Sequence, residues 1–207
     1  MASPDTGKEK MKIVLPEPQR DGRLSLEQCL ARRRSIRHFS RKPIALRQVS
    51  QLLWAAQGIT SPSGYRTAPS AGALYPLEMY AAAGLVEDLS AGVYHYRPRD
   101  HALVLIRQGD VRPVLTESAL GQSAVNFGAA TLAIAAVFER TTGKYGRRGR
   151  QYVHLDAGHA AQNICLQATA LGLGTVPIGA FHDDMVAKTL HLPGDQVPLY
   201  LLPVGMP

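Results

Sequence analysis

The order of helical and strand-like segments predicts a single α+β domain. Helix and strand patterns are mixed along the chain, without the regular βαβ repetition of a doubly wound sheet. The run AATLAIAAVFER at 129–140 is largely apolar, as expected of a central strand covered on both faces. A chain of 207 residues is long enough for one domain with a sizeable core.

The composition limits the partners and the compartment. A net charge of +7 and an isoelectric point of about 9.6 indicate an anionic partner, which could be a phosphate, a nucleic acid or a membrane. Cys29 and Cys165 form no CxxC pair, so we expect neither a disulfide framework nor a metal site. No segment has the roughly 18 apolar residues of a membrane span, and the polar start lacks a signal core. We therefore expect a cytoplasmic protein without a membrane partner.

The N-terminal part is expected to contain an arm and a first helix. Residues 1–22 contain three prolines and scattered charges, which predict an extended arm, and the folded domain then covers 23–207. The first helix is expected at 24–34, because Ser25 and Gln28 have the spacing of a capping box.

The middle of the chain is expected to alternate between helices and strands. Apolar residues at helical spacing predict a helix at 45–58, and the Ser, Gly and Pro content predicts a long functional loop at 59–76. A strand is expected at 77–84. A hairpin at 92–107 follows from two β-prone arms joined by a turn-rich connector, and a helix is expected at 110–122.

The C-terminal part is dominated by one long helix. A basic, glycine-containing loop is expected at 141–151, and a helix that is apolar almost all round is expected from Asp156, its N-cap, to 172. Such a helix should be buried on all sides, in the core or at a subunit interface. His159, in its first turn, has no second ligand at metal spacing and is expected to be a core or interface residue. The remaining elements are a strand at 175–181, a short helix at 182–192 and a strand at 197–207.

A cluster of cations near the N-terminus is the first candidate site. The stretch ARRRSIRHF contains Arg32, Arg33, Arg34, Ser35 and Arg37. Forked guanidinium donors and a hydroxyl can hold a phosphate. A solvated basic face is an equally simple interpretation of this cluster taken alone.

Three further segments are weaker candidates. PSAGALYP offers Ser70 and an open backbone at Gly72, but alone it is only a loop. Lys144 and Tyr145 pair an amine with a phenol, and both can transfer a proton, although such pairs usually lie on the surface. The GLG after the long helix lacks a third glycine after a strand, so it does not indicate a dinucleotide site.

Five motifs occur in one order over about residues 26–205: RRSIRHF, RTAPSAGALYPLEMY, KYG, DAGHAAQNICLQATALGLGTVPIGAF and LYLLPVG. Together they resemble the nitroreductase superfamily and, within it, the SagB-type dehydrogenase branch. The resemblance implies a nitroreductase-like FMN-binding fold, with a central, mostly antiparallel sheet flanked by helices. It also implies an intertwined homodimer with one FMN in each of two interface clefts. In this branch azoline rings on peptides are oxidised to azoles, whereas wider relatives reduce nitroaromatics, quinones or flavins with NADPH or NADH.

The same resemblance assigns cofactor-binding residues. The amides of Gly179 and Ala180, after the long helix, would orient the flavin ring. A cation at the pyrimidine edge of the ring would stabilise the reduced flavin. The implied residues are Arg33, Arg34 and Ser35 at the phosphate and ribityl chain, Arg37 at the pyrimidine edge, Pro69, Ser70, Ala71 and Gly72 on one flavin face from the partner subunit, and Pro177, Ile178, Gly179 and Ala180 on the other face.

The resemblance also implies a catalytic pair, and the sequence differs from the family pattern at one position. Lys144 and Tyr145 match the Lys-Tyr pair that azoline oxidases use as base and proton relay. Met206 stands where family members commonly have an arginine that reaches the phosphate. Loss of one charge-assisted bond would weaken FMN binding by roughly tenfold to a hundredfold, which the arginines at 32–34 could offset. Azoline oxidases usually work beside a cyclodehydratase, and no such domain is recognisable in this sequence.

We therefore expect an FMN-dependent oxidoreductase that transfers a hydride through the flavin. A SagB-type dehydrogenase acting on an azoline peptide and an NAD(P)H-dependent reductase of a small nitro or quinone compound both fit. The sequence does not decide between these directions or between NADH and NADPH. The alternative is a non-catalytic flavin-binding protein that has lost its phosphate anchor. A nucleic-acid partner is disfavoured, because the basic residues coincide with flavin motifs and few aromatic residues are interleaved for base stacking.

Overall fold

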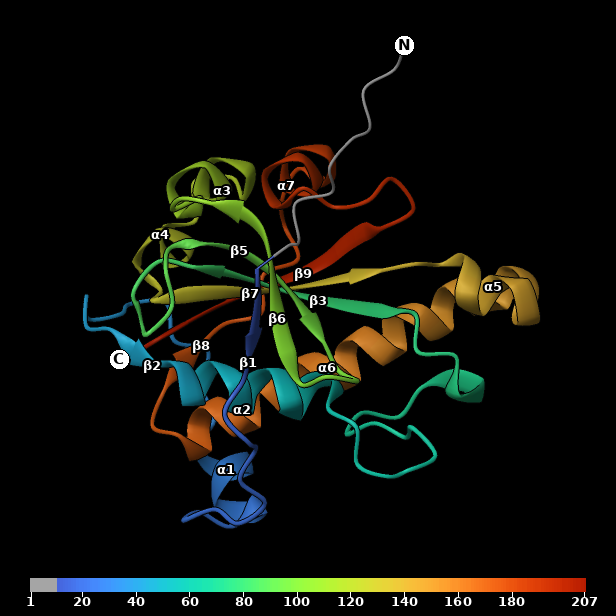
Figure 1. Cartoon of the computed structure of the whole chain (residues 1–207), viewed down its shortest axis with the longest axis horizontal. Helices are drawn as coiled ribbons and strands as arrows, with labels where there is room; N and C mark the ends of the chain where they lie inside the picture. Colours follow the sequence, from blue (N-terminus) through green and yellow to red (C-terminus); the bar gives the residue numbers. More distant parts are fainter. Residues whose placement is uncertain (1–10) are drawn as a thin grey trace.

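An antiparallel sheet of seven strands forms the centre of the fold (Figure 1). The computed structural model describes residues 11–207. The strand order is β1-β6-β5-β3-β7-β9-β8, and each neighbouring pair is antiparallel. The strands are β1 (Lys12–Val14), β3 (Leu77–Ala83), β5 (Gly92–Arg97), β6 (Ala102–Gln108), β7 (Ala130–Ala136), β8 (Gly174–Thr175) and β9 (Val197–Gly205), with a separate parallel pair of β2 (Ile44–Ala45) and β4 (Val86–Glu87).

Helices cover both faces of this sheet. Figure 1 shows α1, α2 and α6 on one face and α3, α4 and α7 on the other. The helices are α1 (Leu26–Arg32), α2 (Leu46–Gln57), α3 (Arg112–Ser118), α4 (Ser123–Phe127), α5 (Glu139–Tyr145), α6 (Gly149–Ala170) and α7 (Asp183–Leu190), with short 3-10 turns at Ala71–Ala73 and Gly146–Arg148. The expected α+β class with a mostly antiparallel sheet flanked by helices is confirmed. Within residues 11–207, no helix is both long and apolar enough to cross a membrane.

The central strand β7 separates two hydrophobic cores. All seven of its residues are buried, and it pairs with β3 on one side and β9 on the other. Side chains alternate between the faces of a strand. Leu132 and Ile134 therefore join the core under α2 and α6, whereas Ala133 and Ala135 join the core under α3, α4 and α7. The predicted strand is confirmed, although its last residues, from Glu139, belong to α5.

The first helix follows the sequence prediction closely, whereas residues 12–15 of the predicted extended arm are packed into the fold, contrary to the prediction. The Ser25 hydroxyl accepts a hydrogen bond from the amide of Gln28 at 3.2 Å, and the Gln28 side chain accepts one from the Ser25 amide at 3.1 Å, so the predicted capping box of α1 is confirmed. The predicted arm includes residues 1–10, which lie outside the described residues. Its later part forms β1 at the sheet edge, and Leu15 is buried in the core.

Helix α6 begins at Gly149, so the prediction that Asp156 caps it is wrong. Asp156 lies in the third turn, and the loop predicted at 141–151 is mostly helical. A Cβ on Gly149 would lie 2.8 Å from the Cα of Thr142. This glycine therefore permits a close approach between two helices instead of ending one.

The prediction that α6 is buried on all sides is wrong for the single chain. One stripe faces the core and includes Val153, Ala157, Ala160 and Ile164, whereas the opposite stripe is exposed and includes Leu155, Gly158, His159 and Gln162. Leu155 is 56% exposed, and His159 lies in the middle of the helix, not in its first turn or in the core. The open stripe is mixed in character, and Leu155 is its one large apolar side chain among those named, which a second chain could cover.

The strand predicted at 175–181 is shorter than expected. Regular pairing stops after Thr175, because Pro177 has no N–H to donate to a neighbouring strand. Ile178 then forms a single antiparallel bridge with Leu201 of β9. The segment after β8 is thus held to the sheet at one point and is otherwise irregular.

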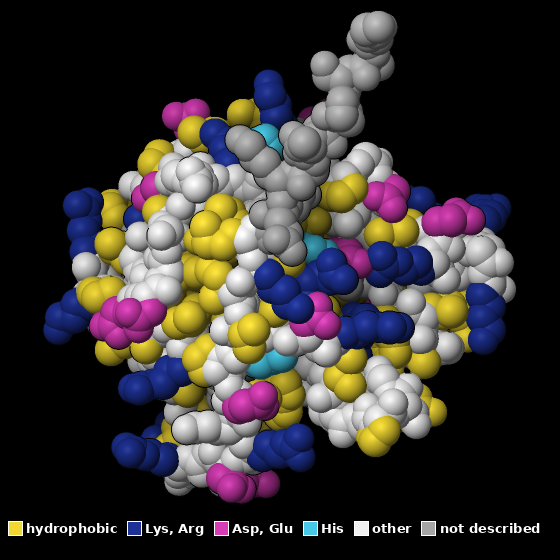
Figure 2. All heavy atoms as spheres, viewed as in Figure 1, with side chains coloured by type: hydrophobic (Ala, Val, Ile, Leu, Met, Phe, Trp, Pro, Cys, Tyr) yellow, Lys and Arg dark blue, Asp and Glu magenta, His cyan; other side chains and the backbone are white. Residues whose placement is uncertain are grey.

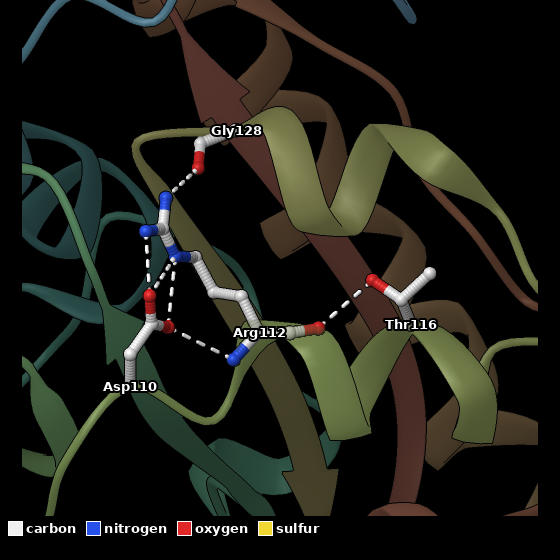
Figure 3. Close-up of polar contacts among 4 residues, drawn as sticks. All are labelled: Asp110, Arg112, Thr116 and Gly128. Carbon is white, nitrogen blue, oxygen red and sulfur yellow. Dashed lines mark hydrogen bonds and ion pairs between the residues drawn. The ribbon is translucent and has the colours of Figure 1, made fainter.

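Arg112 joins α3 to the loops around it (Figure 3). Its Nε and Nη2 donate to the Asp110 carboxylate at 2.9 and 2.7 Å, and its Nη1 donates to the Gly128 carbonyl at 2.7 Å. These bonds hold the pKa of Asp110 below its usual value. Within α3, the Thr116 hydroxyl donates to the Arg112 carbonyl at 2.8 Å. The guanidinium lies so close to Gly84 that a Cβ there would come within 1.9 Å of Nε.

We expect Gly84→Ala to lower the free energy of unfolding by about 3 kcal/mol, because its methyl group would displace the buried Arg112 from Asp110. Urea titration measures this loss. Gly194→Ala is the control, since a Cβ at Gly194 meets no atom within 4 Å, and its effect should stay within about 0.5 kcal/mol. Equal stability of the two variants would contradict the role of Gly84.

Candidate active site

The predicted phosphate-binding segment lies directly beside β8. Ser35 forms a parallel bridge with Thr175, and the Ile36 amide donates to the Thr175 carbonyl at 3.0 Å. A Cβ on Gly174 would lie 2.7 Å from Cγ2 of Ile36, so the close approach requires glycine at this position. As a result, the basic segment neighbours the chain that leads into residues 177–180.

The cations of this segment carry charge that no acidic side chain balances. Within residues 11–207, neither Arg33, Arg34 nor Arg37 forms an ion pair. Arg34 donates through Nη1 to the carbonyls of Arg33 at 2.7 Å and Ala31 at 3.0 Å. Arg34, Ser35 and Arg37 are exposed, and Arg33 is half-buried. This arrangement suits an anionic ligand.

Residues 178–180, which follow β8 by three to five positions, present free backbone donors. The Ile178 amide donates to the Leu201 carbonyl at 2.8 Å, and the Gln122 side chain donates to the Ala180 carbonyl at 2.8 Å. These two bonds fix the segment at both ends. Within the described part of the chain, the amides of Gly179 and Ala180 donate no backbone hydrogen bond, and both residues are exposed. Two N–H groups are therefore available to a ligand.

Met206 contributes its backbone and not a charge to this region. Its carbonyl accepts hydrogen bonds from the amide of Ser40 at 2.8 Å and from the Ser40 hydroxyl at 3.2 Å. Its side chain packs against the core. Met206 thus holds the end of the basic segment in place.

A second group of predicted site residues forms around Gly72. This residue has φ of 62°, in the left-handed region that favours glycine. A Cβ here would lie 2.7 Å from the Tyr145 hydroxyl and 3.2 Å from Nζ of Lys144. The ring of Tyr145 meets the ring of Tyr152 edge to face at 5.1 Å. The exposed Pro69 begins the loop. The structure thus brings the predicted proton-transfer pair against the predicted flavin-facing loop.

Asp156 joins this second group, although the sequence motif that it begins indicated only a helix N-cap at this position. The Ala71 amide lies 3.4 Å from Oδ1, whereas Oδ2 is buried with no hydrogen-bond partner among residues 11–207. Burial raises the pKa of Asp156 above its usual value, against the opposing effect of the Ser70 hydroxyl and the Ala71 amide. Asp156 could have been recognised as a site residue because it is a single carboxylate on an otherwise apolar stretch of helix. Carboxylates are rarely buried without a partner or a function.

The first group consists of the basic segment and residues 177–180, and the second lies around Gly72. The two groups lie at opposite ends of α6. Figure 1 shows α5 at the start of this helix and β8 beyond its end. The helix has 22 residues and is therefore about 33 Å long. One chain assembles each group, and within the described residues no hydrogen bond joins them.

Comparison with known proteins places this arrangement in a family. The sequence profile of the nitroreductase family matches residues 30–206. The chain belongs to the nitroreductase family. A protein of Methanocaldococcus jannaschii named as a nitroreductase is 44% identical over 197 residues, which cover 95% of this chain and 97% of that protein. A crystal structure of a nitroreductase from Ralstonia eutropha has 32% identity and a TM-score of 0.82, covering 94% of this chain and 89% of that one.

A third relative supports the resemblance to the SagB-type branch. The microcin B17-processing protein McbC of Escherichia coli is 30% identical over 164 residues, which cover 76% of this chain. The match spans only 60% of the length of McbC. Membership of the nitroreductase family indicates that the protein is an oxidoreductase.

We expect Gly72→Ala to displace the Tyr145 side chain, because the new Cβ would lie within 3 Å of its hydroxyl. NMR of the tyrosine ring resonances measures this displacement. Gly64→Ala is the matched control, since Gly64 also has positive φ, +82°, but a Cβ there meets nothing within 4 Å. Both variants should lose roughly 1 kcal/mol of stability from backbone strain. Unchanged Tyr145 resonances in Gly72→Ala would show that the loop and the Lys-Tyr pair are not in contact.

Proposed function

We propose that the protein is an FMN-dependent oxidoreductase that transfers a hydride through the flavin. The observation that carries this proposal is that the segment with the unbalanced cations Arg33 and Arg34 bridges β8 through Ser35, and that β8 leads into the free amides of Gly179 and Ala180. FMN has a phosphate at one end and hydrogen-bond acceptors on its ring, and the two sets of donors match these two features. Family membership supports the same cofactor.

The residues that would hold the cofactor come from three segments. When bound, FMN would supply two-electron chemistry, and the protein would supply orientation and electrostatics. The proposed contacts are Arg33, Arg34 and Ser35 for the phosphate and ribityl chain, Arg37 for the pyrimidine edge, Pro177, Ile178, Gly179 and Ala180 for one flavin face, and Pro69, Ser70, Ala71 and Gly72 for the other.

We further propose that the complete site forms in a homodimer, with the loop at 69–72 contributed by the partner subunit. The separation of the two groups along α6 supports this arrangement, because one chain does not unite them. Large apolar side chains also stand open on the helical side of the chain, with Leu26 60%, Leu30 53% and Leu155 56% exposed. A dimer interface would remove such side chains from water. The proposed unit is a single domain at 23–207, to which residues 12–15 of the preceding arm add the edge strand β1 and the buried Leu15.

Lys144 and Tyr145 are the proposed catalytic pair. In a SagB-type dehydrogenase, the amine would take a proton from the azoline ring and the phenol would relay it. In an NAD(P)H-dependent nitro or quinone reductase, the acceptor would take its protons from water, and the pair would not be required. The proposed substrates are therefore a small molecule or an azoline peptide, and the proposed compartment is the cytoplasm. We expect no nucleic-acid partner.

A second candidate is a non-catalytic flavin-binding protein. Met206 favours it, because its side chain packs against the core and supplies no charge to a phosphate. Such a protein would bind flavin that neither a pyridine nucleotide nor an azoline reduces.

We expect the purified protein to bind FMN and to shift its visible absorbance. Arg34→Gln should raise the Kd by roughly tenfold to a hundredfold, because one charge-assisted contact with the phosphate is lost. Arg41→Gln is the control, since it changes the charge equally, but its guanidinium lies over the Phe127 ring at 5.2 Å. Absence of binding would contradict the cofactor assignment. Bound flavin that bleaches with NADPH or NADH would favour the reductase, and bleaching only with an azoline peptide would favour the dehydrogenase.

We expect Lys144→Ala to slow azoline oxidation by at least about a hundredfold, because general base catalysis contributes that much or more. Quinone reduction by a pyridine nucleotide should change far less, since hydride donation to flavin needs no base. Steady-state turnover with each substrate measures both effects. Lys188→Ala, on the exposed side of α7, is the control. Unchanged azoline turnover in Lys144→Ala would remove the base role.

A further inference from the structure

A pocket separate from both groups opens behind the loop at 59–76. It has a volume of about 280 Å³ and lies between the end of α2, the start of β3 and the end of β5. Its polar lining consists of Gln57, Arg66, Glu78, His95, Arg97 and Arg99. Figure 2 shows Lys and Arg side chains grouped on this face, around the turn between β5 and β6. The pocket therefore has more cations than acids in its wall.

Among residues 11–207, Glu78 is the one acid in the pocket wall, and it is already paired with cations. Glu78 pairs through Oε1 with Nη2 of Arg140 at 2.6 Å and through Oε2 with Nε2 of His95 at 2.7 Å. Burial alone would raise the pKa of the Glu78 carboxyl, but the bonds from His95 and Arg140 outweigh it and keep the pKa below its usual value. Both oxygens of this carboxylate are thus engaged by its own two partners, and within residues 11–207 Arg66, Arg97 and Arg99 form no ion pair.

Arg66 is a partly buried cation with unused donors. Its Nη1 donates to the buried Gln57 side chain at 2.7 Å, and its guanidinium stacks over the Tyr75 ring at 4.5 Å. Within the described residues it forms no ion pair and no second side-chain hydrogen bond. A guanidinium has five N–H donors. Burial also lowers the pKa of Arg66, and the charge of the nearby Glu78 offsets this loss of hydration only in part.

We propose that this pocket binds an oxyanion group, a phosphate or a carboxylate, of a small ligand, with Arg66 as its main contact. Arg97 and Arg99 at the exposed end of β5 supply further positive charge. The volume lies just below the usual range of ligand pockets, about 300 to 1,000 Å³, so it fits one anionic group and not a whole cofactor. This site is distinct from the segment that would hold the FMN phosphate.

The pocket is connected to the flavin-facing loop through Tyr75. Its hydroxyl accepts from the Arg66 amide at 3.3 Å, its amide donates to the Ser70 hydroxyl at 3.0 Å, and its carbonyl accepts from Nη1 of Arg140 at 3.2 Å. Arg140 precedes Lys144 by one helical turn of α5, which is about 6 Å. An anion on Arg66 is therefore held next to the residues that shape the loop, and the anionic end of a substrate is its natural source.

Isothermal titration tests the proposal with inorganic phosphate and malonate as separate probes. The full-length protein is used after saturation with FMN. We expect at least one probe to bind, and Arg66→Gln to weaken its binding by at least about tenfold. Tighter binding of phosphate would indicate a phosphate-bearing ligand, and tighter binding of malonate a carboxylate. Lys188→Gln, on α7 and outside the pocket, should bind as the wild type does. Absence of binding by both probes would overturn the proposal.

A parallel titration separates this site from the proposed flavin site. Arg34→Gln and Arg66→Gln are compared without FMN, so that the result does not depend on flavin binding. Binding that is lost in Arg66→Gln and kept in Arg34→Gln supports the pocket even if the protein binds no FMN. Binding that is lost in Arg34→Gln and kept in Arg66→Gln overturns the pocket.

A second variant and a wild-type measurement cover the case in which Arg66→Gln does not fold. Arg97→Gln changes an exposed side chain and should also weaken binding severalfold. In the wild-type protein, the bound probe should shift the backbone amide resonances of Tyr96, Arg97 and Arg99, which line the pocket. Unchanged resonances there at saturating phosphate and malonate would overturn the proposal.

Discussion

Close packing of α6 against the sheet and α2 is the constraint on which both candidate groups depend. Small residues such as Ala157 and Ala160 form its buried stripe, so the helix axis can approach the sheet closely. The Asn163 side chain donates to the Ala55 carbonyl of α2 at 3.0 Å, which fixes the helix along its axis. The start of α6 then places Asp156 under the loop at 69–72, and its end directs the chain into β8. A shift of this helix would move both groups at once.

Local sequence patterns predicted the elements whose partners are near in the chain. The capping box at Ser25 and the apolar spacing of α2 depend on contacts within a few residues, so both helices were predictable. The same reasoning failed at Gly149. A glycine near the end of an apparent loop is typical of a turn, but here it allows contact with Thr142 in the preceding helix. Only the three-dimensional structure distinguishes these two uses of glycine.

The candidate site was predictable where its residues belong to short continuous motifs of known role. Ser35, Gly72 and Lys144 each belong to a short motif, and the structure brings Gly72 to Lys144 as one contact. Asp156 and Arg66 were not recognised, because their significance comes from what surrounds them after folding. Asp156 matters because one of its oxygens is buried without a partner, and Arg66 because Glu78 is already paired with other cations. The spacing of residues in the sequence does not show which polar groups are already paired in the folded protein.

Met206 stands where family members commonly have an arginine. The charge of the neighbouring residues determines how much this difference would weaken phosphate binding. A phosphate monoester carries about −1.5 to −2 charges at neutral pH. Arg33 and Arg34 can balance that charge between them, since neither is paired with an acid among residues 11–207, and the Ser35 hydroxyl adds a neutral donor. An arginine at position 206 would bring a third cation to the proposed phosphate site, where Arg33 and Arg34 would already neutralise the charge. The backbone of Met206 still holds Ser40, so the segment that carries these cations keeps its anchor to β9. On these grounds the methionine lowers the number of donors without leaving the phosphate charge unbalanced.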